Sequence, residues 1–283
     1  MNIKPYLYSS SELQHRISNI LDVELQKNEK SDALRLLLSV IDLTTLEGSD
    51  TDEKIQGLCN KAKNFHKYGH GIPNLAAVCV YPTFVKLAKA ELRNSGVAIA
   101  SVAGAFPSGQ SPISIKLAEI KYAIDQGAEE IDMVISRGLF LAGRHEEVFN
   151  EIASVRKAAK GIHLKVILET GELVTPGNIR LASEMAIHAG ADFIKTSTGK
   201  ITPAATEEAV LVMIDVIKEY HGLTGKMIGL KPAGGISEPE QALRYFQLMQ
   251  HELGPEWLDK KYFRLGASRL ADKIVKLLLD EIA

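Results

Sequence analysis

The stretch Gly127-Ala-Glu-Glu-Ile-Asp132 returns in similar form as Gly190-Ala-Asp-Phe-Ile-Lys195. In both stretches a glycine of the kind that ends a helix is followed by an alanine and a short apolar run. An ionisable residue stands five positions after the glycine, at the far end of the run. The repeat predicts two junctions at which a helix ends and a strand of a parallel sheet begins.

Short apolar or β-branched runs alternate with longer helical patterns along most of the chain. We predict strands at eight of these runs: 40–42, 76–80, 98–103, 131–134, 164–168, 193–195, 227–231 and 263–265. The runs begin about 32 residues apart, so eight units take about 255 residues, close to the ~250 residues of a (β/α)8 barrel. The predicted fold is therefore of the α/β class, a TIM (β/α)8 barrel.

No linker-like or low-complexity segment divides the chain, and we expect a single barrel domain over residues 1–283. About residues 1–37 form an N-terminal extension, in which segment 9–37 has the pattern of one or two amphipathic helices. Its apolar positions are Leu13, Ile17, Ile20, Leu21 and Val23. We expect this extension to cover the bottom of the barrel or a partner subunit.

The composition of the 283 residues, 46% apolar and 24% charged, is typical of a globular protein. A formal net charge of −2 offers no electrostatic attraction to nucleic acid or to an anionic membrane. No run reaches the ~18 apolar residues of a membrane helix. The N-terminus lacks the apolar stretch of a secretory signal, and the two cysteines form no disulfide framework, so we expect a cytoplasmic protein.

Lysine ends two of the predicted apolar strands, at Lys195 and Lys231. Neighbouring parallel strands would bring both side chains to the same mouth of the barrel. Burial beside a second cation depresses a lysine pKa below its ordinary ~10.4. A neutral amine in a pocket attacks carbonyl carbon and forms a Schiff base, so the pair predicts covalent catalysis.

A carboxylate beside such an amine can move the protons of imine formation, and Asp132 is the candidate. In a barrel, alternate strands contribute to one inward layer, which would place Asp132 and Lys195 at the same height, although both could instead face solvent in loops. Asp42 and Lys165 are candidates for a supporting charge network. Their alternative interpretations are a helix or turn cap for Asp42 and a solvent-exposed position at the bottom face for Lys165.

Three glycine-bearing segments follow the last three strands: 196–200, 232–235 and 266–268. Barrels often bind phosphate with the loops after strands seven and eight and with a helix N-terminus. The predicted phosphate-binding residues are Lys200, Gly234, Gly235, Gly266 and Ser268. The scattered histidines and the absence of a ligand motif predict no metal site.

Several of these motifs closely resemble the deoxyribose-phosphate aldolase family of class I aldolases, from about residue 38 onward. They are Asp42-Leu-Thr-Thr45, Glu130-Ile-Asp132, Glu169-Thr-Gly-Glu-Leu173, Phe193-Ile-Lys-Thr-Ser-Thr-Gly-Lys200, Leu230-Lys-Pro-Ala-Gly-Gly235 and Phe263-Arg-Leu-Gly-Ala-Ser268. The resemblance implies that Lys195 is the Schiff-base lysine, that Lys231 lowers its pKa and handles protons, and that Asp132 is the acid/base carboxylate. It also implies phosphate contacts at the five residues named above.

The resemblance further implies reversible cleavage of 2-deoxy-D-ribose 5-phosphate to D-glyceraldehyde 3-phosphate and acetaldehyde, without a cofactor. The expected partners are these small molecules and a second copy of the chain in a homodimer. Two departures stand out: Arg269 replaces a small hydroxyl residue, and the end 280–283 lacks the tyrosine of some relatives. The alternatives are a non-catalytic sugar-phosphate-binding barrel and a barrel enzyme that holds pyridoxal phosphate on Lys195.

Overall fold

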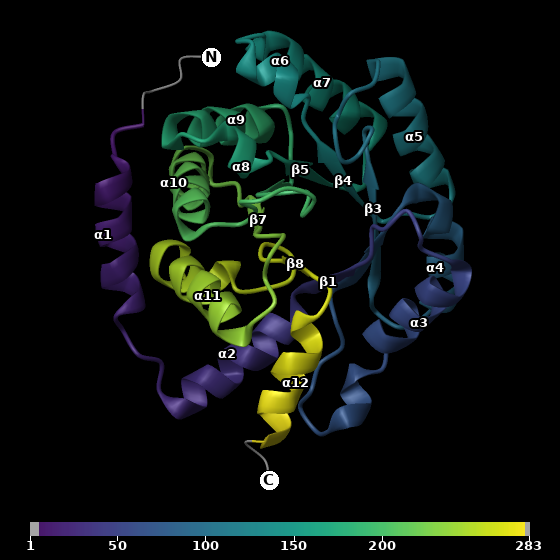
Figure 1. Ribbon diagram of the computed structural model, residues 1–283, viewed down its shortest axis with the longest axis vertical. Coiled ribbons are helices and arrows are strands. Elements are labelled where there is room, and N and C mark those ends of the chain that lie inside the picture. Colours follow the sequence, from purple (N-terminus) through teal and green to yellow (C-terminus); the bar gives the residue numbers. More distant parts are fainter. Residues whose placement is uncertain (1–5, 281–283) are drawn as a thin grey trace.

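The computed structural model describes residues 6–280 and contains eight parallel strands surrounded by helices (Figure 1). The strands are β1 Ile41–Thr44, β2 Ala77–Val80, β3 Ala98–Ala103, β4 Glu130–Val134, β5 His163–Ile167, β6 Phe193–Lys195, β7 Gly229–Lys231 and β8 Leu265–Ala267. They are hydrogen-bonded in the order β7-β6-β5-β4-β3-β2-β1-β8. Parallel bridges from Leu230 to Phe263 and from Ala233 to Gly266 join the two ends of the sheet, which confirms the predicted TIM barrel.

All eight predicted strands are present, and 98–103 and 193–195 have the predicted bounds. The last strand begins at Leu265, two residues later than predicted. Phe263 makes only an isolated bridge to β7, and the ladder with β1 starts at Leu265, opposite Ile41. The apolar pattern identifies this run, whereas its bounds depend on the hydrogen bonds to neighbouring strands.

Helices follow or precede the strands as the pattern predicts. They are α1 Ser10–Leu21, α2 Lys27–Ser39, α3 Asp52–Ala62, α4 Val85–Glu91, α5 Ile113–Asp125, α6 Arg137–Leu141, α7 His145–Ala158, α8 Thr170–Leu173, α9 Pro176–His188, α10 Glu207–Thr224, α11 Pro239–Leu253 and α12 Leu270–Asp280, with 3-10 turns at Phe65–Tyr68, Pro82–Phe84 and Pro255–Trp257. Gly127 and Gly190 stand two residues beyond α5 and α9 with φ of 108° and 103°. Side chains rarely adopt this conformation, so glycine ends both helices as predicted.

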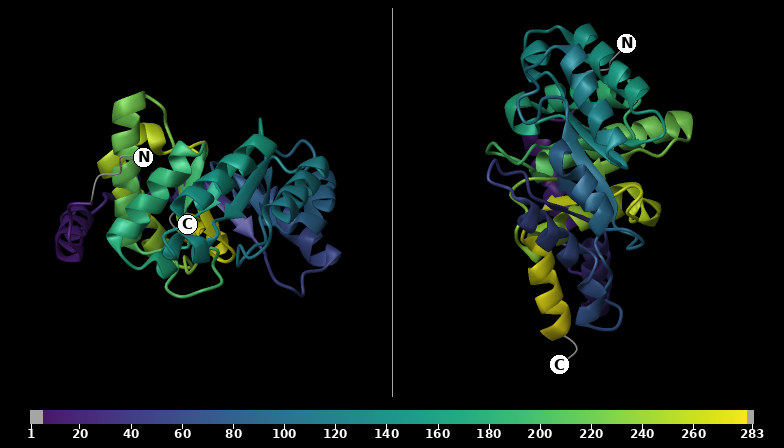
Figure 2. Two further views of the ribbon diagram at one scale, coloured as in Figure 1. Left: turned by 90° about the horizontal axis from the view of Figure 1, so that it is seen from above. Right: turned by 90° about the vertical axis from the view of Figure 1, so that its right-hand side faces the viewer.

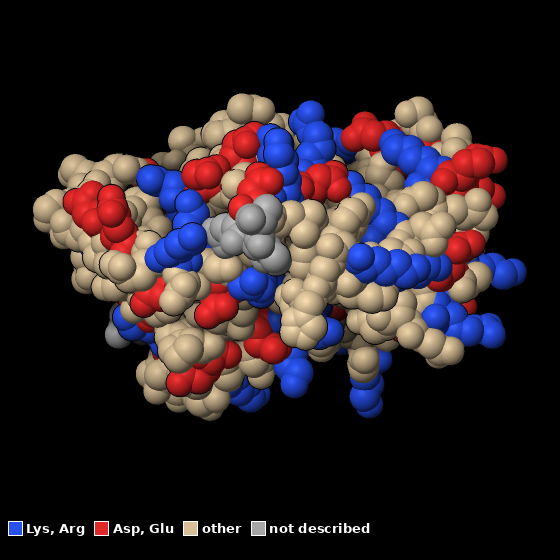
Figure 3. Space-filling view, turned by 90° about the horizontal axis from the view of Figure 1, so that it is seen from below, with Lys and Arg blue, Asp and Glu red and all other residues tan. Residues whose placement is uncertain are grey.

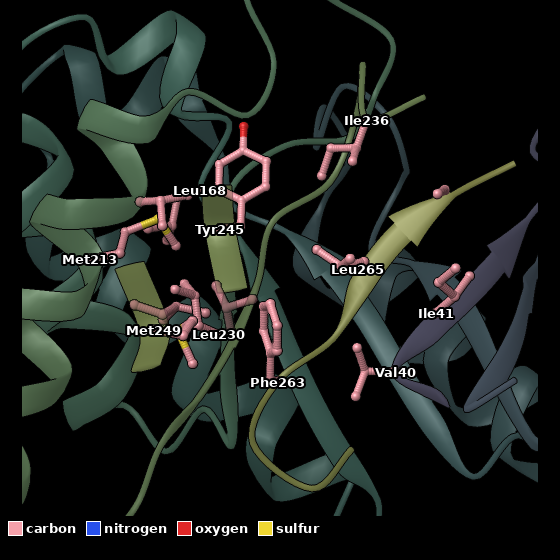
Figure 4. Packing of buried hydrophobic residues seen from close by; sticks show 14 of the residues in the cluster. Val40, Ile41, Leu168, Met213, Leu230, Ile236, Tyr245, Met249, Phe263 and Leu265 are labelled. Carbon is pink, nitrogen blue, oxygen red and sulfur yellow. The ribbon is translucent and has the colours of Figure 1, made fainter. Parts of the chain in front are cut away.

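The hydrophobic core lies between the strands and the outer helices. Figure 4 shows Leu230 of β7 and Phe263 beside Met249 of α11, with Met213 of α10 farther along the same layer; all four are buried. This packing fixes the carboxyl ends of the strands, from which the polar side chains described below project.

The N-terminal extension forms two helices, and α1 lies at the periphery of the molecule (Figures 1 and 2). Its main contacts are with the outer helices α10 and α11, so of the two expected positions the barrel bottom is wrong for this helix, and contact with a partner subunit stays a prediction. The predicted apolar face is buried through Leu13, Ile17 and Ile20, whereas Val23 is 63% exposed because it follows the end of α1. The α2 helix packs against α11 and α12.

Positive and negative side chains alternate over the face shown in Figure 3, as the near-zero net charge leads one to expect. Residues 6–280 include no helix of the length and apolar character needed to span a membrane.

Candidate active site

The central feature of the barrel interior is a pair of lysines on one carboxylate. Lys195 ends β6, Lys231 ends β7, and the two residues are aligned across the parallel ladder. Both Nζ atoms donate a hydrogen bond to Oδ2 of Asp132 in β4, each at 2.7 Å. All three side chains are buried. The structure thus brings together the three residues that strand spacing predicted.

Asp42 and Lys165 extend the same cluster. Asp42 accepts a hydrogen bond from Lys231 at 2.5 Å, and Lys165 donates to Asp132 at 3.0 Å. Both side chains are fully buried. The alternative interpretations, a cap for Asp42 and a solvent-exposed Lys165 at the bottom face, are therefore wrong, because each side chain points into the barrel and pairs there.

Two members of the cluster, Glu130 and Arg264, were not predicted as site residues. Arg264 donates to Asp42 at 2.6 Å and to Glu130 at 2.7 Å, and Lys165 donates to Glu130 at 2.5 Å. A signal for Glu130 was available: it precedes Asp132 by two positions in β4, and alternate residues of a strand face the same side. Arg264 carried a signal as well, because it is a charged residue inside the apolar run 263–265 that was predicted as the last strand.

The charges of the buried cluster balance without Lys195. The carboxylates of Asp42, Glu130 and Asp132 face the cations of Lys165, Lys231 and Arg264, all buried. A proton on Lys195 would add an uncompensated positive charge to a dry interior, where an unpaired ion is costly. The composition of the cluster therefore favours a neutral amine at Lys195.

The two lysines differ accordingly in proton affinity. Burial, with a smaller contribution from the Lys231 charge, lowers the pKa of Lys195 although Asp132 opposes the change. Burial would also lower the pKa of Lys231, but the Asp132 and Asp42 carboxylates outweigh it and raise that pKa. Burial is thus the larger of the two predicted causes, and the second cation contributes less because two carboxylates neutralise Lys231.

A cavity of about 240 Å³ opens above Lys195 at the carboxyl end of the barrel. The five predicted phosphate-binding residues all line it: Lys200, Gly234, Gly235, Gly266 and Ser268. Gly234 and Gly235 have φ of 83° and 75°, and within residues 6–280 no acceptor binds their amides. Free amides of this kind are suited to an anion.

Three charged side chains at the rim of the cavity set its local charge. Lys200 forms an ion pair with Glu47 at 2.9 Å, a partner that the sequence did not indicate. Arg269 also lines the cavity, so the departure from the family pattern adds a cation there. Ser268 lies two residues before the start of α12. The last residues, 281–283, where some relatives carry a tyrosine, lie outside the described part of the chain.

Cys79 is the other nucleophile type near the cluster. It is buried in β2, and burial raises its pKa to about 11, so the thiol keeps its proton near neutral pH. Among residues 6–280, no three potential ligand side chains gather as a metal site would require.

A buried amine of lowered pKa, beside a carboxylate and below an anion-binding cavity, at the carboxyl end of a TIM barrel, is the arrangement of a Schiff-base-forming enzyme. The chain belongs to the DeoC/LacD family of aldolases, whose model matches residues 36–254. It is 45% identical over 258 residues to the human deoxyribose-phosphate aldolase, covering 87% of this chain and 80% of that protein. A putative deoxyribose-phosphate aldolase of Caenorhabditis elegans is 42% identical, with 95% and 89% covered.

Solved structures share the barrel fold. A putative deoxyribose-phosphate aldolase from Coccidioides immitis superposes with a TM-score of 0.73 at 30% identity, covering 95% of this chain and 98% of that one. A deoxyribose phosphate aldolase from Aeropyrum pernix, described as tetrameric, has a TM-score of 0.69 at 24% identity over 98% and 100% of the two chains.

Proposed function

We propose that this protein is a deoxyribose-phosphate aldolase, which cleaves 2-deoxy-D-ribose 5-phosphate reversibly to acetaldehyde and D-glyceraldehyde 3-phosphate. The observation that carries the proposal is that Lys195, a buried amine of lowered pKa, lines one cavity with Lys200 and two free glycine amides. Because the amine and the anion-binding groups line the same cavity, it suits a substrate with an aldehyde at one end and a phosphate at the other.

The chemistry begins with attack of the neutral Lys195 Nζ on the aldehyde carbon of the open-chain sugar. Asp132, already hydrogen-bonded to that nitrogen, moves the protons with which water is expelled from the carbinolamine. The resulting iminium is positive, and Asp132 stabilises it at the position where the amine was neutral. Lys231 keeps its proton because Asp42 and Asp132 both hold it.

In the cleavage step the C3 hydroxyl gives its proton to the Asp132 carboxylate and becomes the aldehyde of D-glyceraldehyde 3-phosphate, which leaves. The C2–C3 electron pair moves to the iminium, so the acetaldehyde carbons stay on Lys195 as an enamine. Protonation and hydrolysis of the enamine release the product. The electron sink is the iminium itself, so the proposed reaction requires neither a metal nor an organic cofactor. The phosphate site fixes which carbon meets the amine, since positioning the far end of a substrate orients its reacting end.

Borohydride reduction in the presence of acetaldehyde, followed by peptide mass mapping, tests this mechanism. We expect a two-carbon adduct on Lys195, because reduction converts the imine into a stable secondary amine. The Lys195→Ala variant serves as the control and should lose both the adduct and the cleavage activity. An adduct found only on Lys231, or none at all, would overturn these roles.

The two alternatives make different predictions. A non-catalytic sugar-phosphate-binding barrel would bind the substrate without detectable cleavage by the wild type. A pyridoxal-phosphate enzyme would purify with the visible absorption of an imine chromophore. The family relationship favours the aldolase, whose name its relatives carry.

We further propose that the protein works in the cytoplasm as a homodimer, with small sugar phosphates as its substrates. The two buried free cysteines, Cys59 and Cys79, support a reducing compartment. Light scattering of the purified protein tests the assembly, and a mass of four chains would replace the dimer with a tetramer.

A further inference from the structure

Glu169 is a buried carboxylate in a strained conformation outside the lysine cluster. It follows β5 by two residues and precedes α8, with φ 58° and ψ 59°. A left-handed conformation in a bulky residue is costly and persists where its surroundings enforce it, often at functional sites. The partners of its carboxylate show what enforces it here.

Three donors converge on that carboxylate. Oε1 accepts the backbone N–H of Thr198 at 3.1 Å, and Oε2 accepts the Thr198 hydroxyl at 2.5 Å. Oε2 also accepts a hydrogen bond from Arg137 Nη1 at 2.9 Å. The Arg137 cation compensates the buried negative charge, so Glu169 can lie close to an anion site without leaving an unpaired charge.

Thr198 connects this carboxylate to the cavity. It lies between Lys195 and Lys200, and its hydroxyl oxygen accepts the backbone N–H of Lys200 at 3.1 Å. Residues 198–200 all line the cavity. Glu169 therefore accepts hydrogen bonds from both the backbone N–H and the hydroxyl of Thr198, the first residue of this segment. Thr198 in turn fixes the position of the Lys200 backbone.

A second contact holds the same loop from behind. A Cβ on Gly171 would clash with the carbonyl oxygen of Pro203, so the backbones of the 169–173 turn and of the loop after β6 touch directly. Thr170 also donates its backbone N–H to Thr196 O at 2.9 Å. The turn that carries Glu169 thus supports the segment 196–203 at three positions.

We infer that Glu169 is a positioning residue for the phosphate end of the substrate, acting through Thr198 on the segment 198–200. The inference rests on the proposed function. Hydrogen-bond donors that are already fixed in position bind an anion without the entropy cost of ordering the loop. Loosening this segment should therefore weaken phosphate binding and leave the amine chemistry intact.

Steady-state kinetics of the Glu169→Gln variant with 2-deoxy-D-ribose 5-phosphate and with unphosphorylated 2-deoxy-D-ribose test this inference. The glutamine keeps the shape of the side chain but turns an amide donor toward other donors. We expect KM for the phosphorylated sugar to rise about tenfold, the size of one lost hydrogen bond to a charged group, with kcat within about twofold. The kcat/KM for 2-deoxyribose should stay at the wild-type value.

Glu172→Gln is the matched control, because Glu172 contacts Arg137 from the same turn but does not contact Thr198. This variant should have the wild-type KM and kcat for both sugars. The pair Thr198→Val and Thr198→Ser provides an independent test that leaves Glu169 in place: valine should raise KM for the phosphorylated sugar, and serine, which retains the hydroxyl, should restore it.

If Glu169→Gln lowered kcat/KM equally for both sugars, the inference would be overturned, because Glu169 would then act on Lys195 or on folding rather than on the phosphate site. Unchanged kinetics in Glu169→Gln would also overturn it. If Glu169→Gln does not fold, the Thr198 pair decides the question. A wild-type protein that cleaves neither sugar would instead refute the proposed function, so the two failures are distinguishable.

Discussion

Lys195 and Lys231 donate to the same oxygen, Oδ2 of Asp132, at the same distance of 2.7 Å. They nevertheless differ in proton affinity, because Lys231 has a second carboxylate, Asp42, at 2.5 Å, whereas Asp132 is the one carboxylate among residues 6–280 that pairs with Lys195. Lys231 thus has two carboxylate partners and stays charged, whereas Lys195 shares a single carboxylate with it and is the nucleophilic amine of the pair.

Replacing Lys231 with leucine should move the acid limb of the kcat/KM profile to higher pH. The charge of Lys231 helps to lower the pKa of Lys195, and its loss leaves the Asp132 carboxylate to hold the proton of Lys195 more tightly. Residual activity measured between pH 5 and 10 checks this shift. Lys200→Met, which removes a cation outside the cluster, should leave the limb in place, and an unchanged profile in Lys231→Leu would contradict the coupling.

The buried carboxylates should make the fold sensitive to acid. Although burial opposes it, the surrounding cations hold the pKa values of Asp132 and Glu130 well below the ordinary range and lower that of Asp42. Below about pH 4 the unfolded chain therefore binds protons that the folded chain does not, so stability falls as pH falls. Urea midpoints at pH 7, 4 and 3 measure this loss. In Asp132→Asn the urea midpoint should fall less between pH 7 and pH 3 than in the wild type. An equal fall would contradict the lowered pKa of Asp132.

Gly234→Ala should destabilise the protein more than Gly235→Ala. Both residues have positive φ, so alanine at either position costs about 1–2 kcal/mol of backbone strain. At Gly234 the new Cβ would also lie 2.7 Å from Ala204 Cβ, whereas at Gly235 it would meet open space. Urea unfolding of the two variants compares their free energies of unfolding. Equal losses of stability would show that the loop containing Ala204 moves aside.

Glu47→Gln should strengthen binding of the phosphorylated substrate. In the free protein Lys200 is paired with Glu47, and a phosphate has to compete for that ammonium. Exposed ion pairs are worth about 0.2–1 kcal/mol, so KM should fall by up to about fivefold. The KM for unphosphorylated 2-deoxyribose is the internal control and should not change. A rise in KM for the phosphorylated sugar would mean that Glu47 orients Lys200 rather than competing for it.

The sequence alone determined the barrel and its principal side chains. Strand periodicity and helix-ending glycines such as Gly127 are local properties, because each depends on backbone conformation and on side chains a few positions apart. They sufficed to place eight strands and to bring Asp132, Lys195 and Lys231 to one mouth of the barrel. The strand ends and the position of α1 depended on contacts with distant elements and were less well predicted.

Only the tertiary structure decided how the charges pair. Arg264 meets Asp42 across 222 positions of sequence, and Glu169 reaches Thr198 from another loop, so no local pattern could indicate either contact. The proton affinity of each lysine depends on the number of carboxylates within a few ångströms and on the exclusion of water. These are properties of the closed barrel interior, which exists only after all eight strands have assembled.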